Sequence, residues 1–364
     1  MINRWELMDE LLVSTVSDFA RREIAKVAEK IDMEDFYPRE LIYKMGELGI
    51  LDPLHFGASL LDAMLCLIEI ARISGSVALI QDVQGELVNA PLRKYGKGLE
   101  ELTDELAKGR IIGSFALSEP CCGSDTTALK TTAKKVRDEW RINGEKMWIT
   151  QGLYANVFLV AARDPDNKIS AFLIRDSQCV EREKVEVEGN RGTGTAKLRF
   201  SECEAELIGN WEVIKYALNI GRIAISALSL GLSIGSMEEA LMWARERQSF
   251  GKKLIEHQGI QWMFSDSMAE ILSVRALLET AVNAFSKNWK ESEYIVSSLK
   301  LLSSRIANQI VDRMVQILGG MGYAKSTRVE RAHRDVRLTR IGEGTDEVQR
   351  IILSRHLEKV LNSL

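Results

Sequence analysis

The chain has 364 residues, of which 46% are hydrophobic and 27% are charged, and its formal net charge is −4. This profile is typical of a globular protein of two or three domains, and the interspersed charges disfavour nucleic-acid or membrane-surface binding. No apolar run reaches the ~18 residues of a membrane span, and the start of the chain lacks the apolar core of a signal peptide. We therefore expect no nucleic acid and no membrane among its partners.

Cysteine and histidine usage disfavours both a disulfide framework and a metal site. The five cysteines are Cys66, Cys121, Cys122, Cys179 and Cys203, and their spacing is typical of neither disulfide pairs nor zinc ligands. Reduced thiols and a cytoplasmic location are the simplest interpretation. The four histidines lie far apart in the sequence, so we expect no bound metal. The one serine with G-x-S-x-G spacing, Ser233, lies inside a predicted helix and not at a strand end, which leaves little support for a covalent hydrolase.

The first 110 or so residues are predicted to be helical. Apolar residues recur at helical spacing in the first 20 positions, and Pro38 opens a second helix because proline suits a first helical position. Further helices are predicted over 60–73 and 77–92. The helix over 77–92 has small and apolar residues on one side and no basic residue before Arg93, as expected of a core helix.

Short strands are predicted from about 111 onwards, because the apolar segments become brief and turn residues separate them. The segments are 111–117, 131–136, 140–150, 157–162, 170–174 and 196–200. Asn143-Gly144 is the strongest hairpin signal among the turns. An antiparallel β-sandwich or β-barrel of roughly 100 residues fits this pattern.

The helical period returns at about 211 and continues to the end. Helices are predicted over 211–248, 256–287 and 292–319, and the first is more than about 50 Å long at ~1.5 Å per residue. Long helices joined by short loops form an antiparallel bundle. The predicted domains are therefore an N-terminal helical domain over 1–110, a β domain over 111–209 and a C-terminal helical bundle over 210–364.

Glu343 is the strongest candidate for a catalytic residue. It stands between Gly342 and Gly344, after a run of arginines, and Thr345 is placed to cap a following helix. Glycines on both sides let another molecule approach the backbone closely. The simpler structural explanation is a solvated glutamate in a turn between two helices.

Other stretches also carry groups that bind anions or planar rings, and each has a structural explanation when taken alone. The stretch 114–125 is a strand that leads into a turn of small polar residues, and 146–150 ends a strand with Trp148 and Thr150. Arg247 and Ser249 stand beside Gly251 at the end of the long helix, where they could hold a pyrophosphate or simply end the helix. The G-G-x-G run over 319–322 follows a helix rather than a strand, so it is not a dinucleotide fingerprint.

Together, in this order and spacing, these stretches resemble the acyl-CoA dehydrogenase family over nearly the whole chain. The family patterns A-L-T-E-P-x-A-G-S-D, W-I-T/S, R-x-x-F-G-x-x-L…Q, Q-x-x-G-G-x-G-[YF] and E-G-T match 116–125, 148–150, 247–258, 316–323 and 343–345. The resemblance implies an α+β fold with an N-terminal helical domain, a central antiparallel β-barrel or sandwich, and a C-terminal four-helix bundle.

The resemblance also implies a flavoprotein that binds FAD between the β domain and the C-terminal bundle. Residues that would line the isoalloxazine ring are Phe115, Leu117, Ser118, Trp148 and Thr150. Residues that would hold the pyrophosphate and adenosine half of an FAD bound mainly by the neighbouring subunit are Arg247, Ser249, Phe250, Gln316 and Gly320. Thr345 and Glu347 would also reach FAD. A homodimer would complete the site, and the family is usually a homotetramer built as a dimer of dimers.

The activity implied is the oxidation of an acyl-CoA thioester to trans-2-enoyl-CoA, as in fatty acid β-oxidation. Glu343 would remove the α-proton while flavin N5 accepts the β-hydride, and an electron-transferring flavoprotein would reoxidise the flavin. Ser124, Arg222 and Gly344 would lie along the CoA–thioester channel. Some members carry the base at the position of Gly221 instead, so Glu343 is the only candidate in this chain.

Three departures from the family pattern keep alternatives open. Gly342 stands where an aromatic residue often packs against the substrate, the N-terminal domain is trimmed after Leu51, and Cys121-Cys122 replaces small residues. Glutaryl-type relatives carry an arginine in the stretch 77–92, where this chain has none, so a plain acyl tail is favoured over a dicarboxylate. The first alternative is a relative acting as an acyl-CoA oxidase or flavin monooxygenase, or on a non-CoA substrate. The second is a non-catalytic or nucleic-acid-binding relative, which the intact flavin motifs disfavour.

Overall fold

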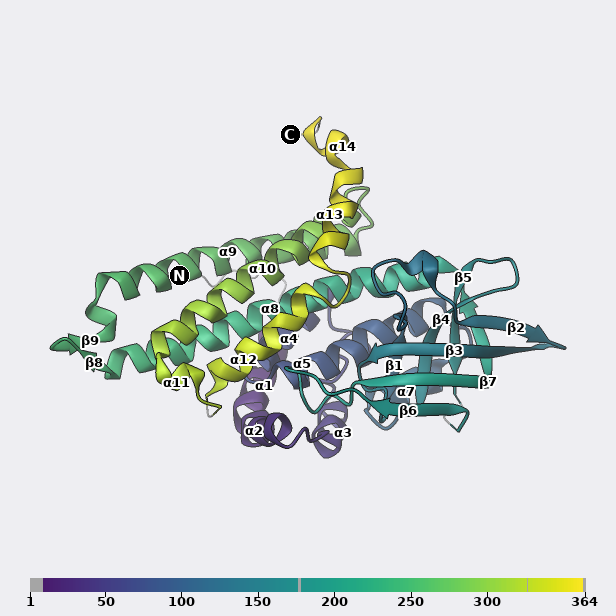
Figure 1. Ribbon diagram of the computed structural model, residues 1–364, viewed down its shortest axis with the longest axis horizontal. Coiled ribbons are helices and arrows are strands. Elements are labelled where there is room, and N and C mark those ends of the chain that lie inside the picture. Colours follow the sequence, from purple (N-terminus) through teal and green to yellow (C-terminus); the bar gives the residue numbers. More distant parts are fainter. Residues whose placement is uncertain (1–8, 176–177, 326, 363–364) are drawn as a thin grey trace.

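The computed structural model describes residues 9–175, 178–325 and 327–362, and these form an elongated molecule with helices at one end and a β domain at the other (Figure 1). The expected order of helices, then strands, then helices is confirmed. The start of the chain, on which the expectation about a signal peptide rests, lies mostly outside the described residues.

The N-terminal region is made of short helices. They are α1 (Glu10–Phe19), η1 (Ala20–Ile24), α2 (Ala25–Met33), α3 (Arg39–Glu47), α4 (Leu60–Ala71), α5 (Gly75–Asp82), η2 (Val83–Asn89), α6 (Ala90–Tyr95) and α7 (Glu100–Ala107). Side chains cap several of them: the hydroxyl of Ser59 accepts from the N–H of Asp62, and that of Ser74 accepts from the N–H of Val77. The segment η2 is a π-helical turn inside the predicted core helix, and π-helical turns occur frequently at functional sites.

The β domain closes into a barrel, as one of the two expected architectures. Its strands are β1 (Gly113–Ala116), β2 (Thr132–Val136), β3 (Glu139–Ile149), β4 (Val157–Arg163), β5 (Ile169–Ile174), β6 (Val180–Lys184) and β7 (Ala196–Gly209). Pairing runs β4–β2–β3–β7–β5 and returns to β4, with β1 and β6 attached to β4 and β7. The sheet is not wholly antiparallel, because β1 and β2 each pair with β4 in parallel. The strand β6 was not predicted.

The predicted hairpin at Asn143-Gly144 is wrong. Both residues lie inside β3, and β2 pairs with β3 through a turn at Arg137 and Asp138. Gly144 has φ +152°, and a Cβ there would lie 2.4 Å from the hydroxyl of Thr131. The register of β3 against β7 also shifts here, so the glycine marks a bulge and a close approach of two strands instead of a turn.

The expectation that all five cysteines are reduced is also wrong. Cys179 and Cys203 form a disulfide, with 5.4 Å between their Cα atoms. The antiparallel pairing of β6 with β7 brings them together, since Val180 lies opposite Phe200. Cys66, Cys121 and Cys122 are free.

The C-terminal region is built on three long helices. The bounds are α8 (Trp211–Glu246), β8 (Gln248–Ser249), β9 (Lys252–Lys253), η4 (Leu254–Glu256), α9 (Gln258–Ser286), α10 (Ser292–Leu318), α11 (Gly320–Tyr323), α12 (Arg328–Asp335), η5 (Val336–Arg340), α13 (Asp346–Arg355) and α14 (Leu357–Leu361). The three long helices lie side by side as the predicted bundle, and α12 and α13 pack against it (Figure 1).

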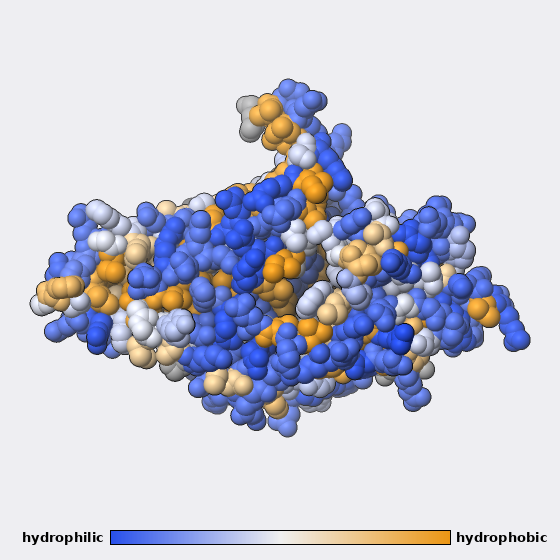
Figure 2. All heavy atoms as spheres, in the orientation of Figure 1, coloured by the Kyte–Doolittle hydropathy of each residue, from blue (hydrophilic) through white to orange (hydrophobic). Residues whose placement is uncertain are grey.

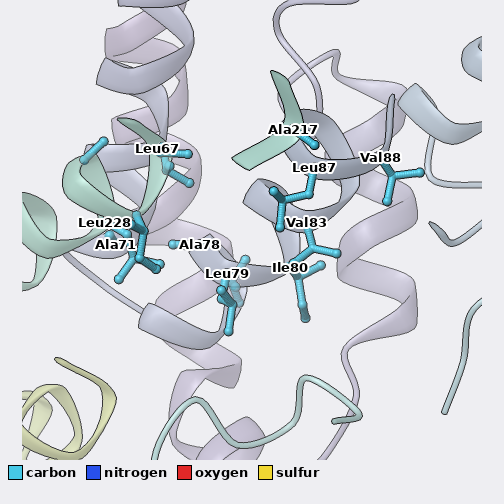
Figure 3. Packing of buried hydrophobic residues seen from close by; sticks show 14 of the residues in the cluster. Leu67, Ala71, Ala78, Leu79, Ile80, Val83, Leu87, Val88, Ala217 and Leu228 are labelled. Atoms are coloured by element: carbon cyan, nitrogen blue, oxygen red, sulfur yellow. The ribbon is translucent and has the colours of Figure 1, made fainter. Parts of the chain in front are cut away.

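The helix α8 joins the three regions into one core. It packs against α4, α5 and η2 of the N-terminal region as well as α9 and α10, and Leu87 of η2 meets Ala217 of α8 (Figure 3). By length and hydropathy α8 could cross a membrane, with a mean of 1.5 over its most apolar window, but 89% of that window is buried inside the protein. Its apolar surface is therefore that of a core helix.

Candidate active site

Glu343 lies in the loop between η5 and α13, in a backbone conformation that glutamate rarely adopts. Its φ is +56°, and Gly344 beside it has φ +90°. The loop ends where the hydroxyl of Thr345 accepts from the N–H of Val348, which confirms Thr345 as the helix cap. A left-handed conformation at a residue other than glycine costs about 1–3 kcal/mol and persists only where the surroundings enforce it.

Side chains from three helices enforce this conformation by holding the loop's carbonyl oxygens. The carbonyl oxygen of Glu343 accepts from Nε of Arg222 at 3.2 Å and from Nε2 of Gln349 at 3.2 Å. The carbonyl oxygen of Gly344 accepts from Nζ of Lys300 at 2.6 Å and from Nε2 of Gln349 at 3.0 Å. Arg222 is fixed in turn by Oδ1 of Asn219. The loop is therefore anchored to α8, α10 and α13 at once.

The carboxylate of Glu343 points into the protein toward α8. A Cβ built on Gly221 would lie 3.0 Å from Oε2 of Glu343 and 2.6 Å from Cδ2 of Leu87, so only glycine leaves room for the carboxylate. Part of the residue remains accessible to solvent, but burial of the carboxylate raises the pKa of Glu343 to about 7, against the charges of Arg222 and Lys300. A carboxylate with this pKa is an effective proton acceptor at neutral pH.

The main-chain N–H of Glu343 stays available for a ligand. None of the hydrogen bonds found among the described residues uses this N–H, although both neighbouring carbonyl oxygens are engaged. A free N–H next to a carboxylate that can take a proton can stabilise negative charge on a carbonyl oxygen.

The strand-end residues predicted to line a flavin do lie together. The N–H of Met147 donates to the carbonyl oxygen of Ser118 at 2.9 Å, and the hydroxyl of Ser114 donates to the carbonyl oxygen of Thr150 at 2.8 Å. These bonds place Phe115, Leu117 and Ser118 of β1 and its following loop beside Trp148 and Thr150 at the end of β3. The indole of Trp148 is 59% exposed and its φ is +64°, so an apolar ring is held outward.

A buried ion pair holds this strand end. Nζ of Lys146 is 2.9 Å from Oε1 of Glu119 and donates to the carbonyl oxygen of Leu117 at 2.8 Å. The carboxylate of Glu119 also accepts from the N–H groups of Lys130 and Thr131. Burial alone would raise the pKa of Glu119, but Lys146 and these N–H groups hold it at about 2. Burial lowers the pKa of Lys146 to about 8 against the pull of Glu119.

Comparison with known proteins identifies the family of this chain. Family models described as the N-terminal, middle and C-terminal domains of acyl-CoA dehydrogenase match residues 8–102, 114–203 and 210–358. The chain belongs to the acyl-CoA dehydrogenase family. It is an oxidoreductase that acts on CH–CH groups, in an FAD-dependent family of fatty acid β-oxidation.

Several relatives match over nearly the whole of this dehydrogenase. The mitochondrial short-chain specific acyl-CoA dehydrogenase of Mus musculus is 35% identical over 369 residues, covering 96% of this chain and 89% of the relative. The probable acyl-CoA dehydrogenase YngJ of Bacillus subtilis is 34% identical, covering 96% and 98%. The butyryl-CoA dehydrogenase of Megasphaera elsdenii has a similar structure, with a TM-score of 0.90, 26% identity and coverage of 96% and 97%.

The residues predicted to hold the pyrophosphate and adenosine half of FAD lie far from Glu343. Arg247, Ser249 and Phe250 follow the far end of α8, about 38 Å from Arg222 along the helix. Gln316 lies in the last turn of α10 and Gly320 begins α11. Figure 1 shows α11 and the β8–β9 hairpin at the end opposite the β domain. One copy of the chain therefore does not bring the two sets of predicted residues together. Phe250 is 97% exposed with φ +50°, so its ring is open to a partner.

The remaining predicted residues are at the surface or at the edge of the site. Ser124 is exposed in the loop after β1, and Glu347 is exposed on α13, where it pairs with Arg350. Gly344 and Thr345 belong to the loop of Glu343 itself. Figure 2 shows a hollow between the C-terminal helices and the β domain, beneath α13. An extended ligand entering this hollow would approach the Glu343 loop.

Cys121 and Cys122 belong to a tight turn with Glu119, whose backbone pairs with that of Cys122. Their sulfur atoms lie 2.6 Å apart, and with Glu119 they form a group of ligand atoms within 4.8 Å of one another. Lys146 and two backbone N–H groups already engage the carboxylate of Glu119, so this group offers a metal little beyond the two thiols.

Sequence reasoning missed Lys300 and Gln349, which hold the loop of Glu343. Lys300 is a buried lysine on a face of α10 that is otherwise apolar and small, and a lysine in such a pattern is the one signal that could have found it. Gln349 follows Thr345 by one helical turn and carries no motif of its own.

Proposed function

We propose that this dehydrogenase oxidises acyl-CoA thioesters to trans-2-enoyl-CoA, with Glu343 as the base. The observation that supports this most is the setting of Glu343. Its carboxylate lies against Gly221 with a pKa near 7, in a loop that Arg222, Lys300 and Gln349 hold in a strained conformation. Such a base has a fixed position and the affinity for protons that removal of a weakly acidic α-proton requires.

Glu343 supports the reaction in two ways. Its carboxylate takes the α-proton, and its free N–H donates to the thioester oxygen, on which negative charge develops as the proton leaves. Arg222 and Lys300 hold the carbonyl oxygens of Glu343 and Gly344, so the N–H and the carboxylate stay in a fixed relation. Arg222, Gly344 and Ser124 are proposed to line the path of the thioester and its CoA.

FAD is the proposed cofactor, and the strand-end residues fit it. The exposed indole of Trp148 and the hydroxyls of Ser118 and Thr150 offer a flat apolar face with polar groups beside it. When bound, FAD supplies the acceptor for the hydride that leaves the β-carbon. Phe115 and Leu117 would complete the ring's surroundings, and Thr345 and Glu347 would reach it from α13.

A second copy of the chain would supply the other half of the cofactor site. Arg247, Ser249, Phe250, Gln316 and Gly320 lie too far from Trp148 to share one FAD with it in the same subunit. A homodimer whose subunits run in opposite directions would bring the far end of one α8 to the β domain of the other. Pairing of two such dimers would give the homotetramer expected from the family.

Short acyl chains are the proposed substrate class, and an electron-transferring flavoprotein is the proposed acceptor. Two observations support the chain length: the mouse relative is named short-chain specific, and the similar structure is a butyryl-CoA dehydrogenase. The cytoplasmic location stays a prediction, and the Cys179–Cys203 disulfide weakens it, because thiols in the cytosol are usually reduced.

An absorption spectrum of the purified protein, followed by anaerobic titration with acyl-CoAs of increasing length, tests the proposal. We expect flavin bands that butanoyl-CoA bleaches more completely than octanoyl- or hexadecanoyl-CoA. Flavin bands that no acyl-CoA bleaches would contradict the reaction and leave the fold. Rapid reoxidation of the bleached protein by O₂ would instead identify an oxidase.

Arg247→Ala tests the second half of the cofactor site. We expect the variant to lose FAD during gel filtration, because the guanidinium would no longer pair with the pyrophosphate. Arg245→Ala is the matched control, since Arg245 is an exposed arginine on the same helix end. Equal FAD content in both variants would remove the proposed role of Arg247.

A further inference from the structure

Asp82 and Glu86 are buried acids, and three of their four carboxylate oxygens have no hydrogen-bond partner in the part of the chain that the structure describes. They lie one helical turn apart, at the end of α5 and within η2, and their exposed fractions are 0% and 1%. Neither side-chain oxygen of Asp82, nor Oε2 of Glu86, has a hydrogen-bond partner among the described residues. Three acceptor atoms are therefore buried without a donor.

The amide side chains of α5 and η2 donate hydrogen bonds to other parts of the N-terminal region. The amide of Gln84 donates to the carbonyl oxygens of Leu106 and Ile111, and the amide of Gln81 donates to that of Ile50. The amide of Asn89 donates to Asp52 and to the carbonyl oxygen of Thr103. These amide N–H groups tie the helix to the rest of the N-terminal region, although Oε1 of Gln81 and Oδ1 of Asn89 have no partner among the described residues. No hydrogen bond from Asp82 or Glu86 to another side chain is found in the same part of the chain.

Asp82 lies near enough to Glu343 to feel its charge, and Glu86 lies next to Leu87, which packs beside Glu343. Burial raises the pKa of Asp82 well above its usual value, and the charges of Glu343 and then Glu86 raise it further. Leu87, which follows Glu86, lies within 2.6 Å of the position that a Cβ on Gly221 would take, next to Oε2 of Glu343. The turn of η2 that carries Glu86 and Leu87 therefore packs against α8 beside the carboxylate of Glu343.

The basic residues around this cluster are engaged elsewhere. Arg222 donates to Glu343 and Asn219, and Lys300 donates to Gly344. The charge of Arg93, an exposed residue of α6, lowers the pKa of Glu86. Burial and the charge of Asp52 raise it more, so the pKa of Glu86 remains well above its usual value. The protein itself therefore leaves Asp82 and Glu86 without the ion pair that buried carboxylates normally require.

We propose that Asp82 and Glu86 bind a cationic group, a protonated amine, at the far end of the acyl chain. An ammonium offers three N–H donors, and three acceptor oxygens are free here. This inference rests on the proposed function, which places the α-carbon of the thioester at Glu343. The acyl group would then extend from Glu343 toward η2, and its amine would supply the charge that the two acids lack.

Pairs of thioesters that differ only in an ammonium or a methyl end test this directly. The pairs are 6-aminohexanoyl-CoA with heptanoyl-CoA and 3-aminopropanoyl-CoA with butanoyl-CoA. Binding is measured by calorimetry on flavin-loaded Glu343→Gln protein, which holds the thioester without turning it over. We expect at least one amine to bind about tenfold or more tightly than its methyl partner, because hydrogen bonds between charged groups are involved. Equal or tighter binding of both methyl partners would overturn the inference.

Charge-removing variants in the same background assign the effect to the two acids. Asp82→Asn with Glu86→Gln keeps the shape of both side chains and should abolish the preference for the amine. Glu101→Gln is the control, because Glu101 is an exposed acid of α7, and it should keep the preference. If the double variant still binds the amine more tightly than its methyl partner, the assignment to Asp82 and Glu86 is overturned. The comparison of thioester pairs itself needs no variant at these two positions.

Bleaching of the unmodified enzyme separates this inference from the proposed function. If heptanoyl- or butanoyl-CoA bleaches the flavin and neither amine binds more tightly than its methyl partner, the proposed cation site is contradicted and the proposed dehydrogenation is supported. If an amine is preferred and no thioester bleaches the flavin, the cation site stands and the dehydrogenation falls.

Discussion

Two pairs of buried ionisable side chains in this protein differ in the hydrogen-bond partners that the fold gives them. In the β domain, Lys146 and Glu119 pair with each other, and backbone groups from Leu117, Lys130 and Thr131 complete their hydrogen bonds. In the N-terminal helices, Asp82 and Glu86 are both acids, and three of their oxygens have no donor among the described residues. Both pairs are buried, so exposure alone does not distinguish them.

Whether the fold supplies hydrogen-bond partners distinguishes buried groups that stabilise the structure from those that are candidates to bind a ligand. The Lys146–Glu119 pair closes the loop after β1 onto β3, and the pKa values of about 8 and about 2 keep both groups charged at neutral pH. Burial raises the pKa values of Asp82, Glu86 and Glu343. Repulsion from Glu343 and Glu86 raises that of Asp82 further, and the charge of Asp52 raises that of Glu86 further. Groups that the fold leaves unsatisfied next to a base are candidates for contact with substrate.

The largest expected effect is on turnover and follows from removing the carboxylate of Glu343. Glu343→Gln should reduce kcat by about 100- to 10,000-fold or more, because an amide does not take the α-proton. Flavin content and acyl-CoA binding should be retained, as measured by absorbance and calorimetry. Glu358→Gln, an exposed acid on α14, is the control and should turn over normally. Comparable kcat values in the two variants would show that Glu343 is not the base.

The next largest effect is on stability and follows from breaking the Lys146–Glu119 ion pair. Lys146→Met should lower the free energy of unfolding by about 3–5 kcal/mol, because it leaves Glu119 buried without its cation. Adding Glu119→Gln should recover much of the loss, since both charges are then gone and the amide oxygen can still accept from a backbone N–H of Lys130 or Thr131. Urea unfolding of both variants measures this. A loss below about 1 kcal/mol for Lys146→Met would show that the pair contributes little.

The pH dependence of stability should differ between wild type and Glu343→Gln. The folded-state pKa of Glu343 is about 7, above the ordinary value of 4.5, so the folded protein holds this proton more tightly than the unfolded chain. The stability that this proton gives is complete below about pH 4.5 and is lost as pH rises through about 7. At pH 8 the variant should therefore be more stable by up to about 3 kcal/mol, with little difference near pH 4. Parallel profiles of unfolding free energy from pH 4 to 8 would contradict the raised pKa.

The smallest effect is a gain in stability from removing an unsatisfied acid. Asp82→Leu should raise the free energy of unfolding at pH 7 by about 1–3 kcal/mol, because three unpartnered acceptors become one. This sign is opposite to that of Lys146→Met and gives the sharpest contrast between the two pairs. Thermal unfolding of the flavin-loaded proteins, compared side by side, measures it. A loss of stability as large as that of Lys146→Met would mean that Asp82 serves the fold after all.

Elements whose signals are local could be predicted from the amino-acid sequence alone. The helical period defined the long helix over Trp211–Glu246 to within about two residues, and Thr345 was recognisable as a cap from its place before an apolar-periodic stretch. The motif around Glu343 also identified the family, because five short patterns occur in the right order. Each of these signals lies within a few turns of chain.

The tertiary structure decided what depends on residues far apart in the sequence. Asn143-Gly144 has the sequence of a turn, but strand pairing and the close approach of Thr131 make it a bulge within β3. Lys300 and Gln349 became visible as supports of Glu343 only when α10 and α13 packed around its loop. Whether a buried acid such as Asp82 or Glu119 finds a partner depends on which distant groups surround it, and local periodicity carries no information about that.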